Sequence, residues 1–178
     1  YDGYKEVWSD EFDGDSLNRA DWNVETHEKG WVNNELQEYV DSAENIQVKD
    51  GKLIINPVKK VTDGDTGSTK EAASYTSGRV STQNKQTFIY GRFECRAKVP
   101  KGQGYLPAFW LMANDENVYG QWPRCGEIDC MEVMGQETNK AYGTLHYGNP
   151  HSQSQGTYTI TDGADFSDDF HIYTCDWE

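Results

Sequence analysis

The sequence contains the run Phe93-Glu94-Cys95-Arg96-Ala97-Lys98-Val99, in which apolar and polar residues alternate without interruption. Successive side chains of a β-strand point to opposite faces of its sheet, so the four apolar residues of this run would share one face and the three charged residues the other. The alternation predicts a strand that is buried on one side and exposed to solvent on the other.

Short runs of this kind recur along the chain between Gly, Asn, Asp and Pro residues, whereas the 3.6-residue period of an amphipathic helix is hard to find. The other predicted strands cover residues 5–10, 46–48, 52–56, 76–82, 108–112, 127–133, 141–147, 157–160 and 171–177. So many short strands with frequent turns predict an all-β fold, a β-sandwich of the jelly-roll type with two antiparallel sheets.

The length of 178 residues suits one domain, and we predict a single domain over residues 1–178. The polar, turn-rich segment 60–70 is predicted to be a surface loop rather than a linker, because strand patterning resumes directly after it. The final predicted strand stops in mid-pattern, which would leave a strand edge and an apolar face uncovered. We therefore expect the domain to be incomplete at its C-terminal end.

The composition restricts the class of partner. The chain has 30 acidic residues against 16 Lys and Arg, a formal net charge of -14, which disfavours binding to nucleic acid or to an anionic membrane. Aromatic residues make up 13% of the chain, unlike a disordered protein, and their flat rings suit the apolar faces of sugars. No apolar run approaches the roughly 20 residues that span a bilayer. The chain starts at Tyr1 without an initiator Met, and we expect a soluble protein with a processed or trimmed N-terminus.

Four cysteines are present, and none has the paired short spacing of a zinc site. They would allow two disulfides in a secreted protein. Cys95, Cys130 and Cys175 lie in predicted strands among apolar residues, whereas Cys125 lies in a predicted loop. We interpret the first three as buried free thiols that act as small hydrophobic residues.

Three carboxylates occur close together in Gly126-Glu127-Ile128-Asp129-Cys130-Met131-Glu132. Glycosidic bonds are broken by two carboxyl groups that flank the bond, so two of these side chains would have to share a face. Glu127 and Asp129 do so in a regular strand, but Glu132, five positions after Glu127, would point away. One extra residue in the strand restores the phase, and such β-bulges are frequent beside active sites. We predict a bulge with Met131 as the extra residue.

Three acids on one face repel one another, so at least one is expected to have a raised pKa and to keep its proton near neutral pH. Such a proton is what the leaving group of a glycosidic bond needs. The alternative interpretation is a solvated acidic strand, but the neighbouring residues Ile128, Met131 and Val133 are apolar. The pattern alone leaves both interpretations open.

Residues 122–135 closely resemble the signature of glycoside hydrolase family 16, in the bulged E-x-D-x-x-E form typical of its laminarinases, the endo-β-1,3-glucanases. Further segments resemble the family in the same order, namely residues 8–12, 33–39, 76–79, 91–94, 107–112 and 143–148. The resemblance covers essentially the whole chain and implies a jelly roll with a concave substrate cleft. Because the family's domain continues beyond the position of Trp177, it also implies that C-terminal strands are missing or are supplied by a second chain.

The resemblance implies a role for each acid. Glu127 would be the nucleophile that forms a covalent glycosyl-enzyme, Glu132 the general acid and then base, and Asp129 a hydrogen-bonding neighbour that tunes both. The anomeric configuration would be retained, which requires the two carboxyl groups to come within about 5 to 5.5 Å. Catalysis would need no cofactor. A structural calcium, as in many family members, would take oxygen ligands from Glu11 and Gly51.

The resemblance also implies a set of substrate-binding residues: Trp110, Trp122, Asn33, Glu35, Arg79 and His146. Five of the six have a plainer interpretation. Trp110 would pack in the core, Asn33 and Glu35 would belong to a turn, Arg79 would be a surface residue and His146 a hydrogen-bonded core histidine. Alternation places Trp110 on the face opposite Phe109 and Leu111, which favours the cleft. Trp31 and Tyr39 are weaker candidates and are interpreted as loop packing.

Together these features predict a secreted or cell-surface endo-β-glucanase that hydrolyses β-1,3 linkages in laminarin-like or mixed-linkage glucans. A lichenase is the nearest alternative, but the unbulged E-x-D-x-E form is more typical of that group. Agarases and carrageenases share the bulge, and their anionic substrates suit a net charge of -14 less well. A non-catalytic glucan-binding domain and an inactive fragment are the remaining alternatives.

Overall fold

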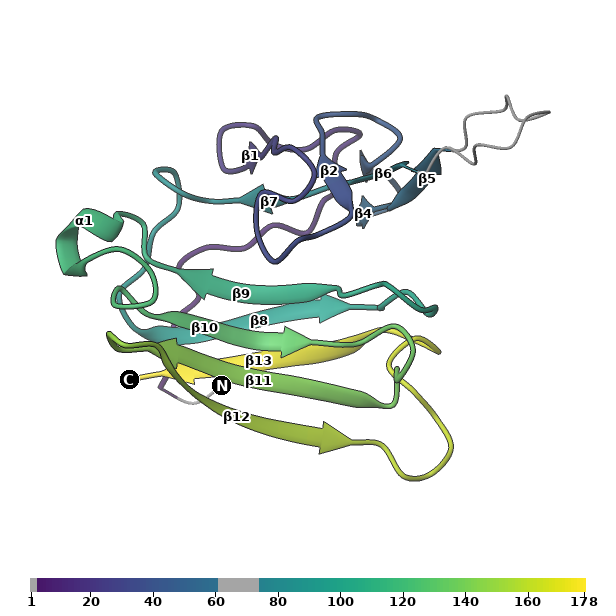
Figure 1. Cartoon of the computed structure of the whole chain (residues 1–178). Helices are drawn as coiled ribbons and strands as arrows, with labels where there is room; N and C mark the ends of the chain where they lie inside the picture. The colour runs from purple at the N-terminus through teal and green to yellow at the C-terminus, as the bar shows by residue number, and fades with distance from the viewer. Residues whose placement is uncertain (1–2, 61–73) are drawn as a thin grey trace, which may run out of the picture. The chain divides into compact units, whose positions relative to one another are not determined.

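The computed structural model describes residues 3–60 and 74–178 (Figure 1). Within these ranges the chain forms thirteen β-strands and one short helix, which confirms the predicted all-β fold. The chain divides into two compact units, one ending at Thr87 and the other spanning Phe88–Glu178. Apart from Lys60, the polar loop predicted over residues 60–70 lies outside the described residues. The single domain over residues 1–178 stays a prediction.

The N-terminal unit contains three small sheets. They are built from β1 (Asn23–Val24), β2 (Gln37–Tyr39), β3 (Ile46–Val48), β4 (Leu53–Ile55), β5 (Val58–Lys60), β6 (Ser74–Ser77) and β7 (Val80–Ser81). β1 pairs with β7, β3 with β4, and β6 lies between β2 and β5, with β2 and β6 parallel. Leu17, Ile46 and Val48 form the buried centre of this unit.

The structure corrects two strand predictions in this unit. Residues 5–10 form no strand, because no described segment pairs with them, and Val7 is 76% exposed. Alternation predicts an amphipathic segment but cannot show that a partner strand exists. The strand predicted over residues 76–82 is instead interrupted at Gly78, where a Cβ atom would lie 2.6 Å from Ile46. The chain passes too close to the core there for any larger residue.

The C-terminal unit consists of two antiparallel sheets. They are formed by β8 (Gly91–Ala97), β9 (Ala108–Met112), β10 (Glu127–Glu132), β11 (Lys140–Tyr147), β12 (Ser152–Thr159) and β13 (His171–Trp177), and the helix α1 (Glu116–Tyr119) follows β9. One sheet has the order β12-β11-β10-β9, and the other pairs β13 with β8. Figure 1 shows β8 and β13 behind β9, β10 and β11.

The core of the C-terminal unit joins these two sheets. Its buried residues are Val99, Met131, Val133, Phe166 and Tyr173. They are contributed by strands of both sheets and by the segments beside them, so the sheets pack face to face as in a β-sandwich. In β8 the predicted alternation is confirmed, since Glu94 and Arg96 are exposed while Cys95 between them is half-buried.

All four cysteines are free thiols, as predicted for three of them, and they are half-buried rather than fully buried. The thiol groups of Cys130 on β10 and Cys175 on β13 form a hydrogen bond across the two sheets. Burial, followed by the neighbouring Cys175, raises the pKa of Cys130. The Cys130 thiol therefore lacks the ionised character of a reactive cysteine. Separately, no helix in the described part of the chain is long and apolar enough to cross a membrane.

Candidate active site

Strand β10 carries the predicted bulge. Against β9, Asp129 pairs with Trp110 and Met131 pairs with Phe109, which leaves Cys130 without a partner residue. The register against β11 shifts between Asp129 and Glu132 as well. The unpaired residue on the β9 side is thus Cys130, and the prediction that Met131 is the extra residue is wrong there. Met131 is only 3% exposed and is held in the core opposite Phe109, so the unpaired position falls to its neighbour.

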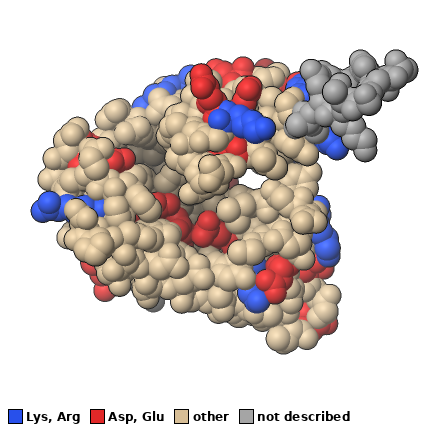
Figure 2. Space-filling view, viewed as in Figure 1, with Lys and Arg blue, Asp and Glu red and all other residues tan. Residues whose placement is uncertain are grey.

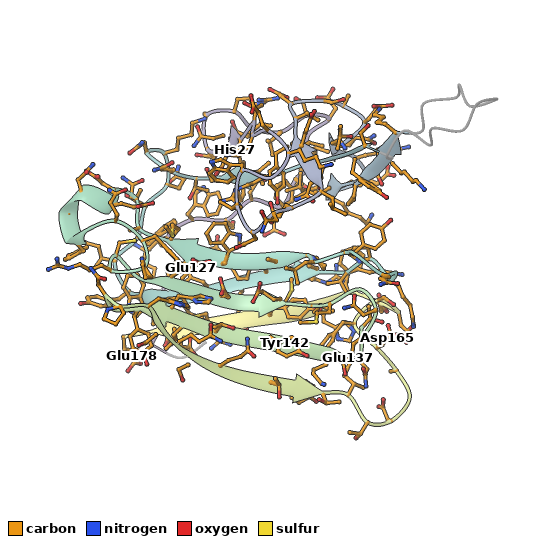
Figure 3. The ribbon with its side chains drawn as sticks, in the orientation of Figure 1. His27, Glu127, Glu137, Tyr142, Asp165 and Glu178 are labelled. Carbon is orange, nitrogen blue, oxygen red and sulfur yellow. The ribbon has the colours of Figure 1, made fainter. Side chains whose placement is uncertain are left out.

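The bulge places the three acids on one face of the sheet. The register pairs across β9 and β10 are Met112 with Glu127, Trp110 with Asp129, and Ala108 with Glu132. Ala108, Trp110 and Met112 are spaced two apart in the regular strand β9, so their side chains share a face. The three acids paired with them on β10 must lie on that same face. Figure 2 shows Asp and Glu side chains gathered over β9 and β10, and Glu127 is labelled there in Figure 3. Trp110 lies on this face, as predicted.

Hydrogen bonds hold two of the acids in place. The indole Nε1 of Trp122 donates to Oε2 of Glu127 over 2.6 Å. His146 Nε2 lies 3.0 Å from Oδ2 of Asp129. Since His146 is paired with Glu127 in the register of β10 and β11, it stands beside both carboxyl groups. The cleft interpretation of Trp122 and His146 is therefore supported by their contacts, whereas sugar binding by either stays a prediction.

Burial and mutual repulsion change how these acids titrate. Asp129 is only 5% exposed. Its burial, the charges of Glu127 and Glu132, and a hydrogen bond to Glu127 together raise the pKa of Asp129 to about 8. Burial also raises the pKa of Glu132, although the nearby His146 acts in the opposite direction. The site therefore retains a carboxyl proton near neutral pH, as three acids on one face led us to expect.

One further residue of this site was missed by the sequence reasoning. His151 Nε2 lies 3.0 Å from His146 Nδ1, and the two rings are stacked with their centroids 5.2 Å apart. His151 also packs against Trp122, with 5.1 Å between the ring centroids. His151 is the last residue of a turn and belongs to no recognisable motif, so only its short spacing from His146 could have signalled it.

The N-terminal unit holds the other predicted substrate residues. Arg79 donates from Nε to Glu25 Oε2 over 2.7 Å, and its guanidinium carbon lies 5.1 Å from the ring centroid of Trp31 and 5.8 Å from that of Tyr39. His27 is stacked on Trp31 and bonded to Glu25. Arg79 is thus half-buried among aromatic rings rather than a plain surface residue, and Trp31 takes part in loop packing as predicted.

Asn33 and Glu35 lie in a turn, as the plainer interpretation of that segment predicted. Asn33 has a positive φ of 51°, and the Glu35 amide donates to the carbonyl of Val32 over 3.0 Å. Glu35 also forms a hydrogen bond with the hydroxyl of Tyr39, where its charge contributes to a raised pKa of Tyr39 that is mainly due to burial. Contact of Asn33 or Glu35 with a sugar stays a prediction.

Among residues 3–60 and 74–178, one group of side chains has the ligand types and spacing for a metal ion, namely Glu127, Asp129 and His146, whose ligand atoms lie within 4.8 Å of one another. These groups already hydrogen-bond to one another. The predicted calcium ligands Glu11 and Gly51 are both exposed. Two oxygens are well short of the six to eight that calcium takes, so the residues named do not by themselves make a calcium site.

An all-β sandwich with a bulged strand that carries three acids on one face has the paired carboxyl groups that glycoside hydrolases use. The chain belongs to glycosyl hydrolases family 16, whose model matches residues 33–178.

Two relatives of the chain are glucan endo-1,3-β-glucosidases. It is 39% identical over 189 residues to glucan endo-1,3-β-glucosidase A1 of Niallia circulans, a match that covers 99% of this chain and 27% of that protein. It is 43% identical over 174 residues to a glucan endo-1,3-β-glucosidase of Cryptopygus antarcticus, covering 96% of this chain and 62% of the relative. The chain therefore spans less than two thirds of the length of either protein.

Among solved structures, the laminarinase catalytic domain from Thermotoga maritima MSB8 matches with a TM-score of 0.83 at 37% identity. This match covers 98% of the present chain and 70% of that one. The likeness confirms the predicted jelly-roll fold.

Proposed function

We propose that the chain is the catalytic part of a retaining endo-β-glucanase that hydrolyses β-1,3-glucosidic bonds in laminarin-like or mixed-linkage glucans. The observation that carries this proposal is the bulge at Cys130, which brings Glu127, Asp129 and Glu132 to one face of the sheet. The endo-1,3-β-glucosidases among its relatives support the linkage. The substrate is a polymer outside the cell, so the protein would be secreted or held at the cell surface.

In the first step, a carboxylate oxygen of Glu127 attacks the anomeric carbon while the carboxyl proton of Glu132 passes to the glycosidic oxygen. The C–O bond to the leaving sugar breaks, and an ester forms between the glycosyl group and Glu127. In the second step, Glu132 takes a proton from water, and the resulting oxygen attacks the same carbon and releases Glu127. Burial that raises the pKa of Glu132 supports its role as the acid, since the proton must still be present near neutral pH.

The contacts of Glu127 suit the role of nucleophile. The Trp122 N–H bonds one oxygen of Glu127 and Asp129 bonds its carboxyl group, so the side chain is oriented before substrate arrives. Protonated Asp129 adds no negative charge next to Glu127. It can strengthen its hydrogen bond to Glu127 whenever that carboxylate is regenerated. Trp110, across from Asp129, offers a flat apolar surface for a sugar ring.

The substrate is tested by incubating the protein with laminarin, lichenan and agarose and measuring new reducing ends. We expect hydrolysis of laminarin, weaker hydrolysis of lichenan and none of agarose. Short oligosaccharides of several lengths among the early products would indicate endo action, and proton NMR of those products would report retention of the β-configuration. Preferred cleavage of lichenan would point to a mixed-linkage lichenase, the second candidate that the family allows.

A non-catalytic glucan-binding domain would behave differently, because it would retain laminarin without releasing reducing ends. Binding without hydrolysis by the folded protein would therefore refute the proposal. The presence of both Glu127 and Glu132 on one face favours the enzyme.

A further inference from the structure

The hairpin that joins β11 to β12 brings a second histidine to the site. Tyr147 is paired with Ser152, so residues 148–151 form the whole connection. Gly148 has a φ of 82°, and a Cβ atom there would lie 3.0 Å from the carbonyl oxygen of Pro150. This tight turn returns the chain so that His151 stacks on His146. His151 is exposed on its other side, so it contributes little to the core.

The hydrogen bonds between these residues form a chain that ends at Glu127. Asp129 bonds to Glu127, His146 Nε2 lies 3.0 Å from Oδ2 of Asp129, and His151 Nε2 lies 3.0 Å from His146 Nδ1. A neutral imidazole has one N–H donor and one acceptor nitrogen, so the direction of one bond fixes the direction of the other. All hydrogen bonds of this series must therefore be donated in the same direction, either toward Glu127 or away from it.

The state of Asp129 decides the sense. Asp129 is 5% exposed and its carboxyl group is hydrogen-bonded to that of Glu127, and a hydrogen bond between two carboxyl groups needs one of them to donate a proton. Asp129 supports a Glu127 carboxylate only as that donor. Asp129 Oδ2 must then accept from His146 Nε2–H, which leaves Nδ1 of His146 as an acceptor. The nearest donor to Nδ1 is Nε2–H of His151. In the opposite sense, Nε2 of His146 would accept the proton of Asp129 and draw it away from Glu127.

We propose that His151 is a positioning residue that fixes His146 in its Nε2–H tautomer by donating a hydrogen bond to Nδ1, so that the Asp129 proton stays directed at Glu127. A second contact of His151 also supports Glu127. The His151 ring packs on Trp122, whose indole N–H donates a hydrogen bond to Glu127. Glu127 has two hydrogen-bonded neighbours, and His151 thus supports Trp122 directly and Asp129 through His146. The catalytic consequence rests on the proposed role of Glu127 as the nucleophile.

The test uses the full chain labelled with ¹⁵N-histidine, compared with His151→Phe and His151→Gln. Phe keeps a ring for Trp122 but has no donor, while the Gln amide can place a donor near the former Nε2. The ¹⁵N shifts of His146, measured at a pH where both imidazoles are neutral, report its tautomer. We expect the Nε2–H form in the native chain and in His151→Gln, and a mixture of tautomers in His151→Phe.

The kinetic measurement follows the same variants on laminarin. The loss of one neutral hydrogen bond predicts a fall in kcat of about 3- to 10-fold for His151→Phe, with KM unchanged and with kcat restored by His151→Gln. His171→Phe is the matched control, since His171 packs on Phe166 at the end of β13 next to the core. That variant should leave both the tautomer of His146 and kcat unchanged.

Two results would overturn the proposal: an Nδ1–H tautomer of His146 in the native chain, or ¹⁵N shifts of His146 that do not respond to His151→Phe. A loss of kcat in His151→Phe that His151→Gln does not restore would also contradict it, because packing rather than donation would then matter. If the native chain hydrolyses no glucan, the proposed function fails, while the tautomer measurement still decides the role of His151.

Discussion

At the scale of single residues, Asp129 is the most strongly perturbed acid of the site. It is 5% exposed and lies beside two other carboxyl groups, so its neutral form is favoured in the folded protein. Asp129 is then a hydrogen-bond donor rather than a third negative charge. This difference matters because a nucleophilic carboxylate between two other anions would gain repulsion instead of support.

The pKa of Asp129 makes a prediction for stability. In the unfolded chain this carboxyl group titrates near its model value of 3.8, and in the folded protein its pKa is about 8. Between these two pKa values the folded protein keeps a proton on Asp129 that the unfolded chain has lost. The free energy of unfolding should therefore fall as the pH rises from about 4 to about 8. Asp129→Asn, which mimics the neutral acid, should flatten that decline. Urea unfolding at several pH values measures the effect.

Asp165 provides a control of opposite sign. Its hydrogen bonds with Lys101 and Ser167 lower the pKa of Asp165 well below its usual range. Its stabilising contribution is therefore present above the unfolded pKa and lost as the pH falls. Asp165→Asn should destabilise the protein at neutral pH and leave the decline between pH 4 and 8 in place. If Asp129→Asn shows the same decline as the native chain, the burial of a neutral Asp129 is contradicted.

The two proposed catalytic glutamates should respond differently to the leaving group. Glu127→Gln removes the nucleophile and should lower kcat by at least about 10³-fold on every substrate. Glu132→Gln removes the acid, so activity on laminarin should fall by about 10²- to 10⁴-fold. With an aryl glycoside whose leaving group needs no proton, the rate of the first step should fall much less. The control is Glu137→Gln, a carboxylate bonded to Lys140 and Tyr142. Equal losses for Glu127→Gln and Glu137→Gln would refute the assignment.

Trp122 should contribute through its N–H group as well as its ring. Trp122→Phe keeps an aromatic surface but removes the 2.6 Å hydrogen bond to Glu127. Hydrogen bonds to charged groups contribute about 1.5–3 kcal/mol, so kcat should fall roughly 10- to 100-fold. Trp177→Phe, at a ring that packs on Tyr90, should leave kcat unchanged. An unaltered kcat in Trp122→Phe would indicate that the bond does not orient Glu127 during the reaction.

At the scale of the elements, the bulge in β10 was predictable but its detail was not. Two carboxyl groups must face one sugar, and the spacing of Glu127 and Glu132 meets that need only with an extra residue. The identity of the extra residue depends on which side chain the core accepts. Met131 fills the core opposite Phe109, so Cys130 is left unpaired, and this choice is made by packing between sheets rather than by the strand's own pattern.

Strand prediction succeeded where alternation reflects a buried face. The boundaries predicted for β3, β9 and β13 are those observed. The two- or three-residue strands β1, β2 and β5 are too short to show a period and were missed. Residues 5–10 show the converse error, because their pattern is amphipathic but no described strand pairs with them. Pairing depends on distant segments, and a single segment's sequence does not contain that information.

The turn after β10 should be sensitive to the size of one residue. A Cβ atom at Gly135 would lie 2.2 Å from the carbonyl oxygen of Gly102 and 2.8 Å from Cβ of Tyr105. Gly135 also accepts a hydrogen bond from the amide of Gly102 and donates one to Tyr105. Gly135→Ala must displace backbone and should destabilise the protein by about 1–3 kcal/mol.

Urea unfolding measures this effect, with Gly156→Ala as the matched control. Gly156 lies in the exposed strand β12, and nothing lies within 4 Å of its Cβ position. That substitution should be neutral or slightly stabilising, because alanine restricts the unfolded chain more than glycine does. A Gly135→Ala protein as stable as Gly156→Ala would show that the turn adjusts freely.

At the scale of the whole molecule, the resemblance to a family predicted more than any local pattern. It assigned roles to Glu127, Asp129 and Glu132 and selected His146, which a single sequence would leave as a core histidine. It did not select His151, because that residue acts only through contacts that the β11–β12 hairpin creates. Arg79 and Glu25 show the same limit, since their ion pair joins residues 54 positions apart.

Metal removal separates the proposed chemistry from a structural ion. Since hydrolysis would be carried out by carboxyl groups, EDTA should leave kcat on laminarin unchanged at temperatures far below Tm. Glu11 and Gly51 can form a calcium site only with ligands beyond themselves. If they do so in this chain, millimolar Ca²⁺ should raise Tm, and Glu11→Ala should abolish that rise. A loss of kcat with EDTA in a folded protein would contradict metal-free catalysis.

The bulge at Cys130 has a further consequence for how such enzymes evolve. Deleting Cys130 or Met131 would leave Glu-Ile-Asp-X-Glu, in which all three acids fall on one face of a regular strand by simple alternation. The bulged and unbulged forms of the strand are therefore separated by the loss or gain of one codon. A lineage can cross between them in a single event without changing any of the three acids, whereas a one-residue insertion into the present strand would turn Glu132 toward the core.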